Sequence, residues 1–399
     1  MFRPQPRRFR IGLALALIWL PAGPLQASGP SRQLAAAAFE DAYNLEFAAS
    51  YARLEEAARV DPADPAPERA MAAITWMELL FSQGAATFEA FTGQASKSDV
   101  ARPTPPPALV ARFTAHIKKA MALAEAGLTP RADADAHYQM GATAALSAIY
   151  RATVEGKTVG ALGEGRRAVK EMQIARKLAP GKREPALVLG LSEYTVSTLA
   201  FPVRWLAGLT GLGGNRGDAL ALLEQAASGG ADTEADALLV LMVVYNREGN
   251  HAAASDRLAR LRARFPQNRL LYLNAAVTAI EAGQYDSAER DLIAGLTSRD
   301  LQSPPVAGEH ALWLLKRGTA RAALGRATDA LTDLSSALAA APRDWVRGRT
   351  HFELARLALA RREAAEAARQ LQLAIEFGEK GGDADAVKAA QSLLKRTRQ

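Results

Sequence analysis

The sequence contains no cysteine, so disulfides, thiol catalysis and thiolate metal sites are excluded. Aromatic residues make up only 6% of the 399 residues. Beyond the N-terminal leader, no segment approaches the roughly 18 consecutive apolar residues that would suggest a membrane-spanning helix. Runs that alternate apolar and polar residues and are rich in Val, Ile or Thr are also missing, so we expect no substantial β-sheet.

Motifs for catalysis and cofactor binding are missing as well. The glycine-rich stretch at residues 201–218, FPVRWLAGLTGLGGNRGD, has no lysine after its glycines and follows no strand. It therefore matches neither a Walker loop nor a dinucleotide fingerprint. The five histidines are scattered without HExxH spacing, and no GxSxG motif occurs. We predict a non-enzymatic protein that holds no cofactor and no metal.

The charge is mildly basic but not concentrated on the folded part of the chain. Lys and Arg number 49 against 42 Asp and Glu, a formal net charge of +7, and four of the arginines lie in the first ten residues. The remainder is nearly balanced, whereas a nucleic-acid binder concentrates basic residues on one face. We therefore expect no nucleic-acid partner.

The N-terminus has the pattern of an export signal. An arginine-rich start precedes the apolar residues 11–20, IGLALALIWL, which are followed by the breakers Pro21 and Gly23. This apolar run is half the roughly 20 residues that a membrane span requires. We predict a signal peptide at residues 1–27, a mature chain that begins near Ser28, and a periplasmic or secreted location. A retained amphipathic anchor is the alternative.

The rest of the chain repeats a helical pattern, with apolar residues at i, i+3 and i+4 between short breaks. Small residues recur where two antiparallel helices would touch, because a large side chain there would hold the helices apart. One unit, residues 314–342, carries this pattern in full, with Gly318, Ala330 and Ala337 at the contacts, Gly325 in the turn and Pro342 at the end.

This spacing resembles the tetratricopeptide repeat (TPR) family, whose unit of about 34 residues is a helix–turn–helix. The resemblance implies an all-α fold, a right-handed α-solenoid of about eight units. Segments such as AYNLEF and DWVRGRTHFELARLA are also similar to exported bacterial TPR proteins of unassigned function. Residues 28–230 are expected to form irregular N-terminal units, and residues 231–399 regular ones. The expected unit ends are Pro62, Pro130, Pro180, Gly230, Pro266, Asp300, Pro342 and Glu379.

Units two to four are longer than the others, and we expect insertions between their first and second helices. In unit two the insertion includes the proline run at residues 103–107, which is incompatible with helix. The insertion of unit three is expected within residues 150–165. Stacked insertions would form a continuous ridge, while longer helices in units three and four are the alternative. In unit four, Pro202 is expected to end one helix and Asp218 to open the next.

Helical repeats without catalytic motifs build extended binding surfaces, so another protein or peptide is the expected partner. Trp and Arg are common anchors in interfaces, and aromatic residues gather around the insertions. Alternatively, these aromatics pack the insertions onto the solenoid. The candidate partner-binding residues are Trp76, Phe88 and Phe91 in unit two, Phe201, Arg204 and Trp205 in unit four, and the amide–cation pair Asn246 and Arg247 in unit five.

A second pair of groove candidates is Asn274 with Lys316, although mostly apolar residues occupy the other groove positions. An alternative function is a small-ligand or lipid carrier. It would require an apolar pocket of at least ~300 Å³ under the insertions of units two to four.

Overall fold

The computed structural model describes residues 29–85, 87–88, 103–129, 132–198, 214–228, 233–297 and 306–397. These residues contain seventeen α-helices and no strand. None of their helices is long and apolar enough to cross a membrane. The expected all-α class is confirmed, and the expected signal peptide lies outside the described residues.

The helices of the first four units pack as consecutive pairs. The pairs are α1 (Gly29–Tyr43) with α2 (Phe47–Val60), α3 (Pro65–Ser82) with α4 (Pro107–Leu128), α5 (Ala134–Thr153) with α6 (Thr158–Leu178), and α7 (Pro185–Ser197) with α9 (Arg216–Ala226). Each pair also contacts the next, so the units form one stack.

The last four units continue the stack in the same way. Their pairs are α10 (Glu234–Arg247) with α11 (His251–Arg264), α12 (Arg269–Glu281) with α13 (Tyr285–Thr297), α14 (Glu309–Ala323) with α15 (Ala327–Ala339), and α16 (Asp344–Ala360) with α17 (Ala364–Lys380). A single final helix, α18 (Ala384–Thr397), packs against α17 and covers the end of the array. The expected solenoid of about eight units is confirmed.

The small residues have the role that their spacing indicates. Ala330 and Ala337 are fully buried, and a Cβ added to Gly318 would lie 2.8 Å from the Leu334 side chain. Gly325 adopts a φ of +78° in the turn between α14 and α15, a conformation that favours glycine. The helix pairs can therefore approach closely only with these residues at their crossings.

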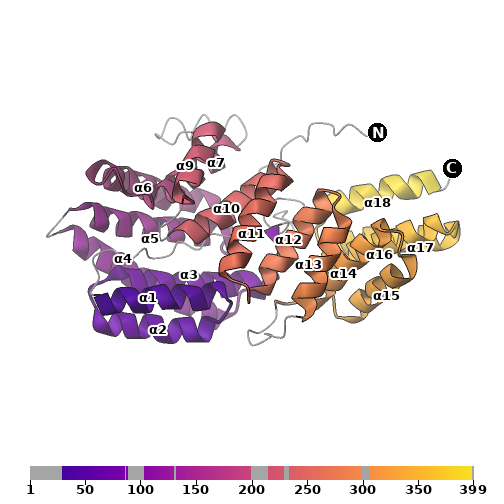
Figure 1. Ribbon diagram of the computed structural model, residues 1–399, viewed down its shortest axis with the longest axis horizontal. Coiled ribbons are helices and arrows are strands. Elements are labelled where there is room, and N and C mark those ends of the chain that lie inside the picture. Colours follow the sequence, from indigo (N-terminus) through magenta and orange to yellow (C-terminus); the bar gives the residue numbers. More distant parts are fainter. Residues whose placement is uncertain are drawn as a thin grey trace.

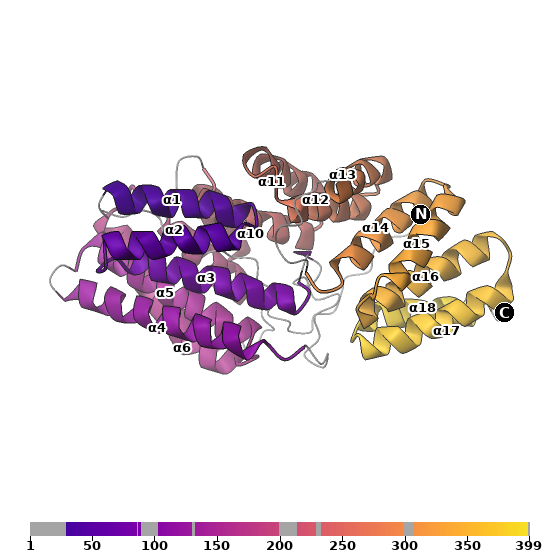
Figure 2. The ribbon, with the colours of Figure 1, turned by 90° about the horizontal axis from the view of Figure 1, so that it is seen from below.

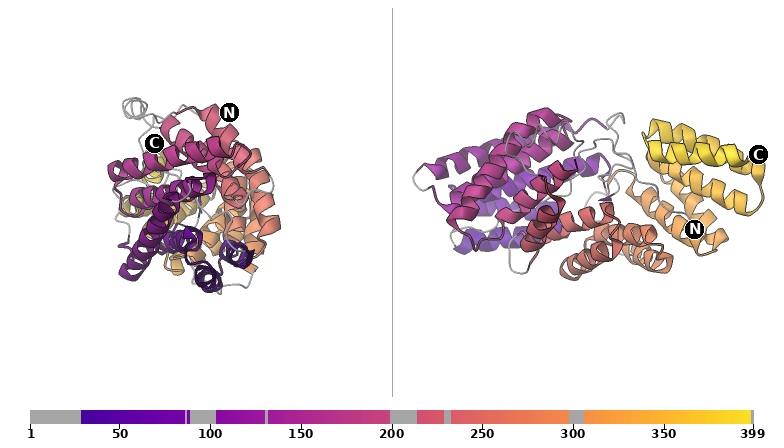
Figure 3. Two further views of the ribbon diagram at one scale, coloured as in Figure 1. Left: turned by 90° about the vertical axis from the view of Figure 1, so that its left-hand side faces the viewer. Right: turned by 90° about the horizontal axis from the view of Figure 1, so that it is seen from above.

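Figures 1 and 2 show the helices in two groups along the long axis, with α1–α6 at one end and α14–α18 at the other. Helices α10–α13 lie between the two groups, and the right-hand view of Figure 3 shows the same order from the opposite side. The array therefore runs from an N-terminal end to a C-terminal end through units five and six.

Units two and three differ in how they accommodate their extra length. In unit two the extra residues separate α3 from α4, and Pro107 at the end of the proline run is the first residue of α4. In unit three the expected insertion is wrong, because α5 and α6 are 20 and 21 residues long and only residues 154–157 separate them. Longer helices, the alternative, account for this unit, so the three insertions do not form a continuous ridge.

In unit four the extra residues again lie between the two helices, but the expected helix ends are wrong. Helix α7 ends at Ser197, before Pro202, and Asn215 rather than Asp218 caps α9. The Asn215 side chain accepts a hydrogen bond of 2.8 Å from the backbone N–H of Gly217.

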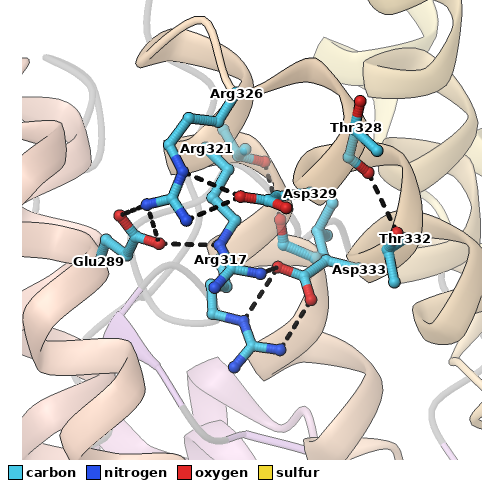
Figure 4. A network of polar contacts seen from close by, with 10 residues as sticks. Glu289, Arg317, Arg321, Arg326, Thr328, Asp329, Thr332 and Asp333 are labelled. Carbon is cyan, nitrogen blue, oxygen red and sulfur yellow. Dashed lines mark hydrogen bonds and ion pairs between the residues drawn. The ribbon is translucent and has the colours of Figure 1, made fainter.

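A polar network ties unit six to unit seven (Figure 4). Arg321 of α14 bonds both Glu289 of α13 and Asp333 of α15, at 2.8 and 2.9 Å. Arg317 binds the same Asp333 through two hydrogen bonds of 2.9 and 2.7 Å. Arg326 adds a further contact of 2.7 Å to Glu289. These shared carboxylates fix the orientation of one regular unit on the next.

Candidate functional site

The end of α1 contacts units five and six, far away in the sequence. The Tyr43 hydroxyl donates a hydrogen bond to the Asp236 carboxylate, and the Tyr43 ring stacks on Phe265 with 4.5 Å between ring centroids. The Tyr43 backbone carbonyl accepts a hydrogen bond of 2.7 Å from the side-chain amide of Asn268. The end of unit one therefore packs directly against units five and six.

The beginning of the unit-two insertion crosses to the C-terminal units. We call residues 83–85 and 87–88 the strap. The backbone N–H of Phe88 donates a hydrogen bond of 2.8 Å to the Asn274 Oδ1 atom of α12. At the other end of the strap, Arg343, which precedes α16, donates to the backbone carbonyl of Gln83. We call Asn274 and Arg343 the strap site. It joins unit two to units six and eight.

Both residues of the strap site are held in place. The Asn274 side chain is only 5% exposed, and its Nδ2 atom donates 2.7 Å to the Leu270 carbonyl, which leaves Oδ1 to accept from the strap. Arg343 lies against Gly84 and Gly308, which adopt φ values of +80° and +72°. A Cβ on Gly84 would collide with the Arg343 guanidinium. The site therefore requires glycine on the strap at this position.

The electrostatics of Arg343 favour a carbonyl ligand. No carboxylate pairs with its guanidinium in the part of the chain that the structure describes. Burial lowers the pKa of Arg343 because the charged form loses hydration. A partly desolvated guanidinium gains most from a good acceptor, and a backbone carbonyl provides one.

The aromatic candidates that fall within the described residues are buried. Trp76 of α3 is fully buried, and its indole N–H donates 2.9 Å to the Thr153 hydroxyl of α5. Phe88 is 4% exposed on the strap. These two side chains pack inside the protein, as the packing alternative expects, and Trp76 has no exposed face for a partner. Phe91, Phe201, Arg204 and Trp205 lie outside the described residues, and their role stays a prediction.

The amide–cation candidates of unit five are also engaged within the chain. Asn246 is 7% exposed, and its Nδ2 atom donates 3.0 Å to both the Met242 carbonyl and the Thr278 hydroxyl. Arg247 is half-buried, with its guanidinium 5.8 Å from the centre of the Tyr194 ring. Asn246 therefore links α10 to α12, while Arg247 lies against α7.

The strap site brings together one residue that the sequence indicated and one that it did not. Asn274 was a groove candidate by its helical position. Arg343 gave no comparable signal, because its role depends on a strap carbonyl 260 residues earlier in the chain. Lys316, the proposed companion of Asn274, is buried in α14. Among the described residues, no group of three or more His, Asp or Glu side chains could hold a metal ion.

Comparison with known proteins yields only structural similarity. No protein-family model matches the sequence, and no curated protein matches it either. Solved structures that resemble it include a tetratricopeptide repeat protein of Parabacteroides merdae, at 13% identity and a TM-score of 0.32, covering 82% of this chain and 100% of that one. Yeast Tom70 is 11% identical at a TM-score of 0.36, covering 91% and 89% of the two chains.

A third similar structure is the human IFIT1 dimer with PPP-AAAA, which is 12% identical at a TM-score of 0.37 and covers 93% of this chain and 91% of that one. The helix pairing of the chain itself defines the class of protein, an all-α solenoid of stacked helix pairs.

Proposed function

We propose that this protein is an exported, non-enzymatic scaffold that binds an extended segment of another protein at the strap site. The supporting observation is that Asn274 and Arg343 bond backbone groups of the strap, the N–H of Phe88 and the carbonyl of Gln83. Every peptide carries these groups, so the site fits an extended segment through its main chain. The buried Phe88 ring supplies an apolar anchor beside these polar contacts.

The strap then represents, within the same chain, the kind of segment that a partner would present. A glycine four residues before a phenylalanine fits the two contacts, since the glycine lies under Arg343 and the phenylalanine N–H reaches Asn274. A partner segment competes with the strap for these side chains. Export of the scaffold is supported by the arginine-rich and apolar N-terminal residues.

A peptide-binding experiment tests the site. In the variant chain, residues 83–88 are replaced by a Gly-Ser segment of equal length, and circular dichroism verifies its helical content. A fluorescent peptide of sequence QGAATF should bind this variant more tightly than the intact chain, whose strap competes. Asn274→Ala in the same background should weaken binding by on the order of tenfold, the effect of losing one buried hydrogen bond.

Two controls make this experiment decisive. The peptide QGAATA lacks the aromatic anchor and should bind more weakly. Asn250→Ala removes an exposed amide that caps α11 and bonds no strap residue, so it should lower stability slightly and leave peptide binding unchanged. A folded strap-replaced variant that does not bind QGAATF contradicts the proposal. Export is tested separately by the intact mass of the protein from its native host, which should correspond to a chain that begins near Ser28.

A further inference from the structure

A cavity of about 220 Å³ lies among units one, two and three, away from the strap site. Its walls come from the loop between α2 and α3, the C-terminal half of α4 and the start of α5. Three aspartates line it, Asp61, Asp64 and Asp135, together with an apolar wall that includes Leu123. This lining differs from the apolar pocket that the carrier alternative requires.

One buried side chain presents a hydrogen-bond donor to this cavity. Gln139 lines it although only 5% of the residue is exposed. Its Oε1 atom accepts a hydrogen bond from the Arg69 guanidinium, which can only donate, so the orientation of the amide is fixed. The Nε2 group forms no hydrogen bond with the part of the chain that the structure describes. Gln139 therefore has a free donor for a ligand in the cavity that it lines.

The three aspartates outnumber the two cations beside them, Lys182 and the Arg69 guanidinium, which acts electrostatically on Asp64. Lys182 forms an ion pair with Asp135, which neutralises one carboxylate. Asp64 accepts a hydrogen bond of 2.9 Å from the Ala66 N–H with one oxygen, and Asp61 has no ion pair among the described residues. A ligand that suits this lining carries a positive group for the carboxylates and a neutral acceptor for Gln139. A short aliphatic part would contact Leu123.

We propose that this cavity binds an α-ammonium group that is followed by a neutral carbonyl, with the aspartates around the ammonium and Gln139 donating to the carbonyl. Both a peptide N-terminus and a free amino-acid amide have this chemistry. A free amino acid fits less well, because its carboxylate adds a negative charge to a cavity that three aspartates already line. A peptide with an acetylated N-terminus lacks the charge altogether.

A calorimetric titration of the mature chain with matched small probes tests the proposal. L-Alaninamide should bind saturably, and L-alanine should bind on the order of tenfold more weakly. N-acetyl-L-alaninamide should not bind. Tri-alanine amide and its acetylated form distinguish a peptide N-terminus from a free amino-acid amide as the ligand. If the free tripeptide binds at least as tightly as alaninamide, the cavity binds peptide N-termini. If alaninamide binds more tightly, the cavity binds the small molecule.

Variants locate the binding at this cavity. Gln139→Glu keeps an acceptor for Arg69 but replaces the donor with an oxygen, so alaninamide affinity should fall on the order of tenfold while the melting temperature is retained. Asp61→Asn should also weaken binding. Three outcomes would overturn the proposal. They are equal binding of the free and acetylated probes, unchanged affinity in folded Gln139→Glu, and no saturable binding of alaninamide at millimolar concentration. Ethylammonium binding as tightly as alaninamide would overturn the role of Gln139.

Discussion

Arg69 and Arg269 are both buried arginines, one in each half of the solenoid, and their surroundings differ sharply. Arg269 and Glu309 are about 5% exposed and form two parallel hydrogen bonds of 2.7 and 2.9 Å. Glu309 also accepts from the Val306 N–H and the Trp313 indole. Arg69 is fully buried but bonds only the Gln139 amide, and its Nε and Nη2 atoms have no partner among the described residues.

The difference follows from how each half is built. Arg269 is the first residue of α12 and Glu309 the first residue of α14, so the two occupy equivalent positions one unit apart. In a regular array each unit has the same position relative to the one before it. A buried polar side chain can therefore pair with a residue at the equivalent position of the next unit. Arg69 forms no ion pair among the described residues. Asp64 and Asp236 act on it only electrostatically, and Asp236, which lies on α10 in unit five, accepts a hydrogen bond from Tyr43 instead.

The largest effect is expected from breaking the regular pair. Arg269→Met should lower the free energy of unfolding by about 3–5 kcal/mol, because it leaves the buried Glu309 carboxylate without its cation. Urea denaturation followed by circular dichroism measures this change. Arg369→Met removes an exposed arginine that pairs with Glu366 on the same helix and should leave the midpoint unchanged. A small effect of Arg269→Met would mean that the regular half does not depend on its inter-unit pairs.

A second, smaller effect tests the small-residue crossings. Ala330→Leu should cost about 1–3 kcal/mol, since Ala330 is fully buried against α14, near Gly318, and has no room for a larger side chain. Ala339 lies exposed in the same helix and provides the matched control, Ala339→Leu. Thermal denaturation of both variants should show a loss only at position 330. Equal melting temperatures would contradict close packing at this crossing.

The features that the sequence predicted are the ones encoded locally. Unit ends such as Pro62 and Pro342 follow from the helical period, the small residues and the proline positions, all of which act within one helix pair. Unit three shows the limit of this approach. An insertion was expected within residues 150–165, yet Gly160, Gly163 and Gly165 lie within α6, where packing against α5 outweighs the low helix propensity of glycine.

The candidate site was less predictable because its contacts depend on the curvature of the whole array. The strap meets Asn274 across 186 residues, and Tyr43 meets Asp236 across 193. Small rotations between units add up over such separations, and no local pattern records their sum. Trp76 was both a candidate anchor and a candidate packing residue; it is fully buried, and its indole bonds Thr153 of the next unit.

A third prediction concerns Asp236 of α10, the buried carboxylate that accepts a hydrogen bond from Tyr43 of unit one. Burial raises the pKa of Asp236 well above its ordinary value of 3.8. As the pH rises from 3.8 toward the raised pKa, the unfolded chain releases this proton first, so the ionised carboxyl destabilises the fold at neutral pH. Asp236→Asn keeps an acceptor for Tyr43 and should stabilise the protein by about 1 kcal/mol at pH 7.

The pH profile of that difference is the control. Urea denaturation of the wild type and Asp236→Asn should give equal stabilities near pH 4 and a gap that opens as the pH rises, reaching a plateau above the folded-state pKa. A gap of constant size at every pH would show that the substitution acts through packing rather than through the charge.

The smallest effect is expected from the same arginine-to-methionine change in the N-terminal half. Arg69→Met removes a buried charge that has no carboxylate in contact, so the regained desolvation energy offsets the lost hydrogen bond to Gln139. It also removes the guanidinium from its place 5.8 Å from the centre of the Tyr138 ring. The net change in unfolding free energy should stay within about 1 kcal/mol of zero, which is much smaller than the loss expected for Arg269→Met. Urea denaturation could instead give equal losses of unfolding free energy for Arg69→Met and Arg269→Met. Arg69 would then have a buried anionic partner, and buried arginines would be paired in both halves.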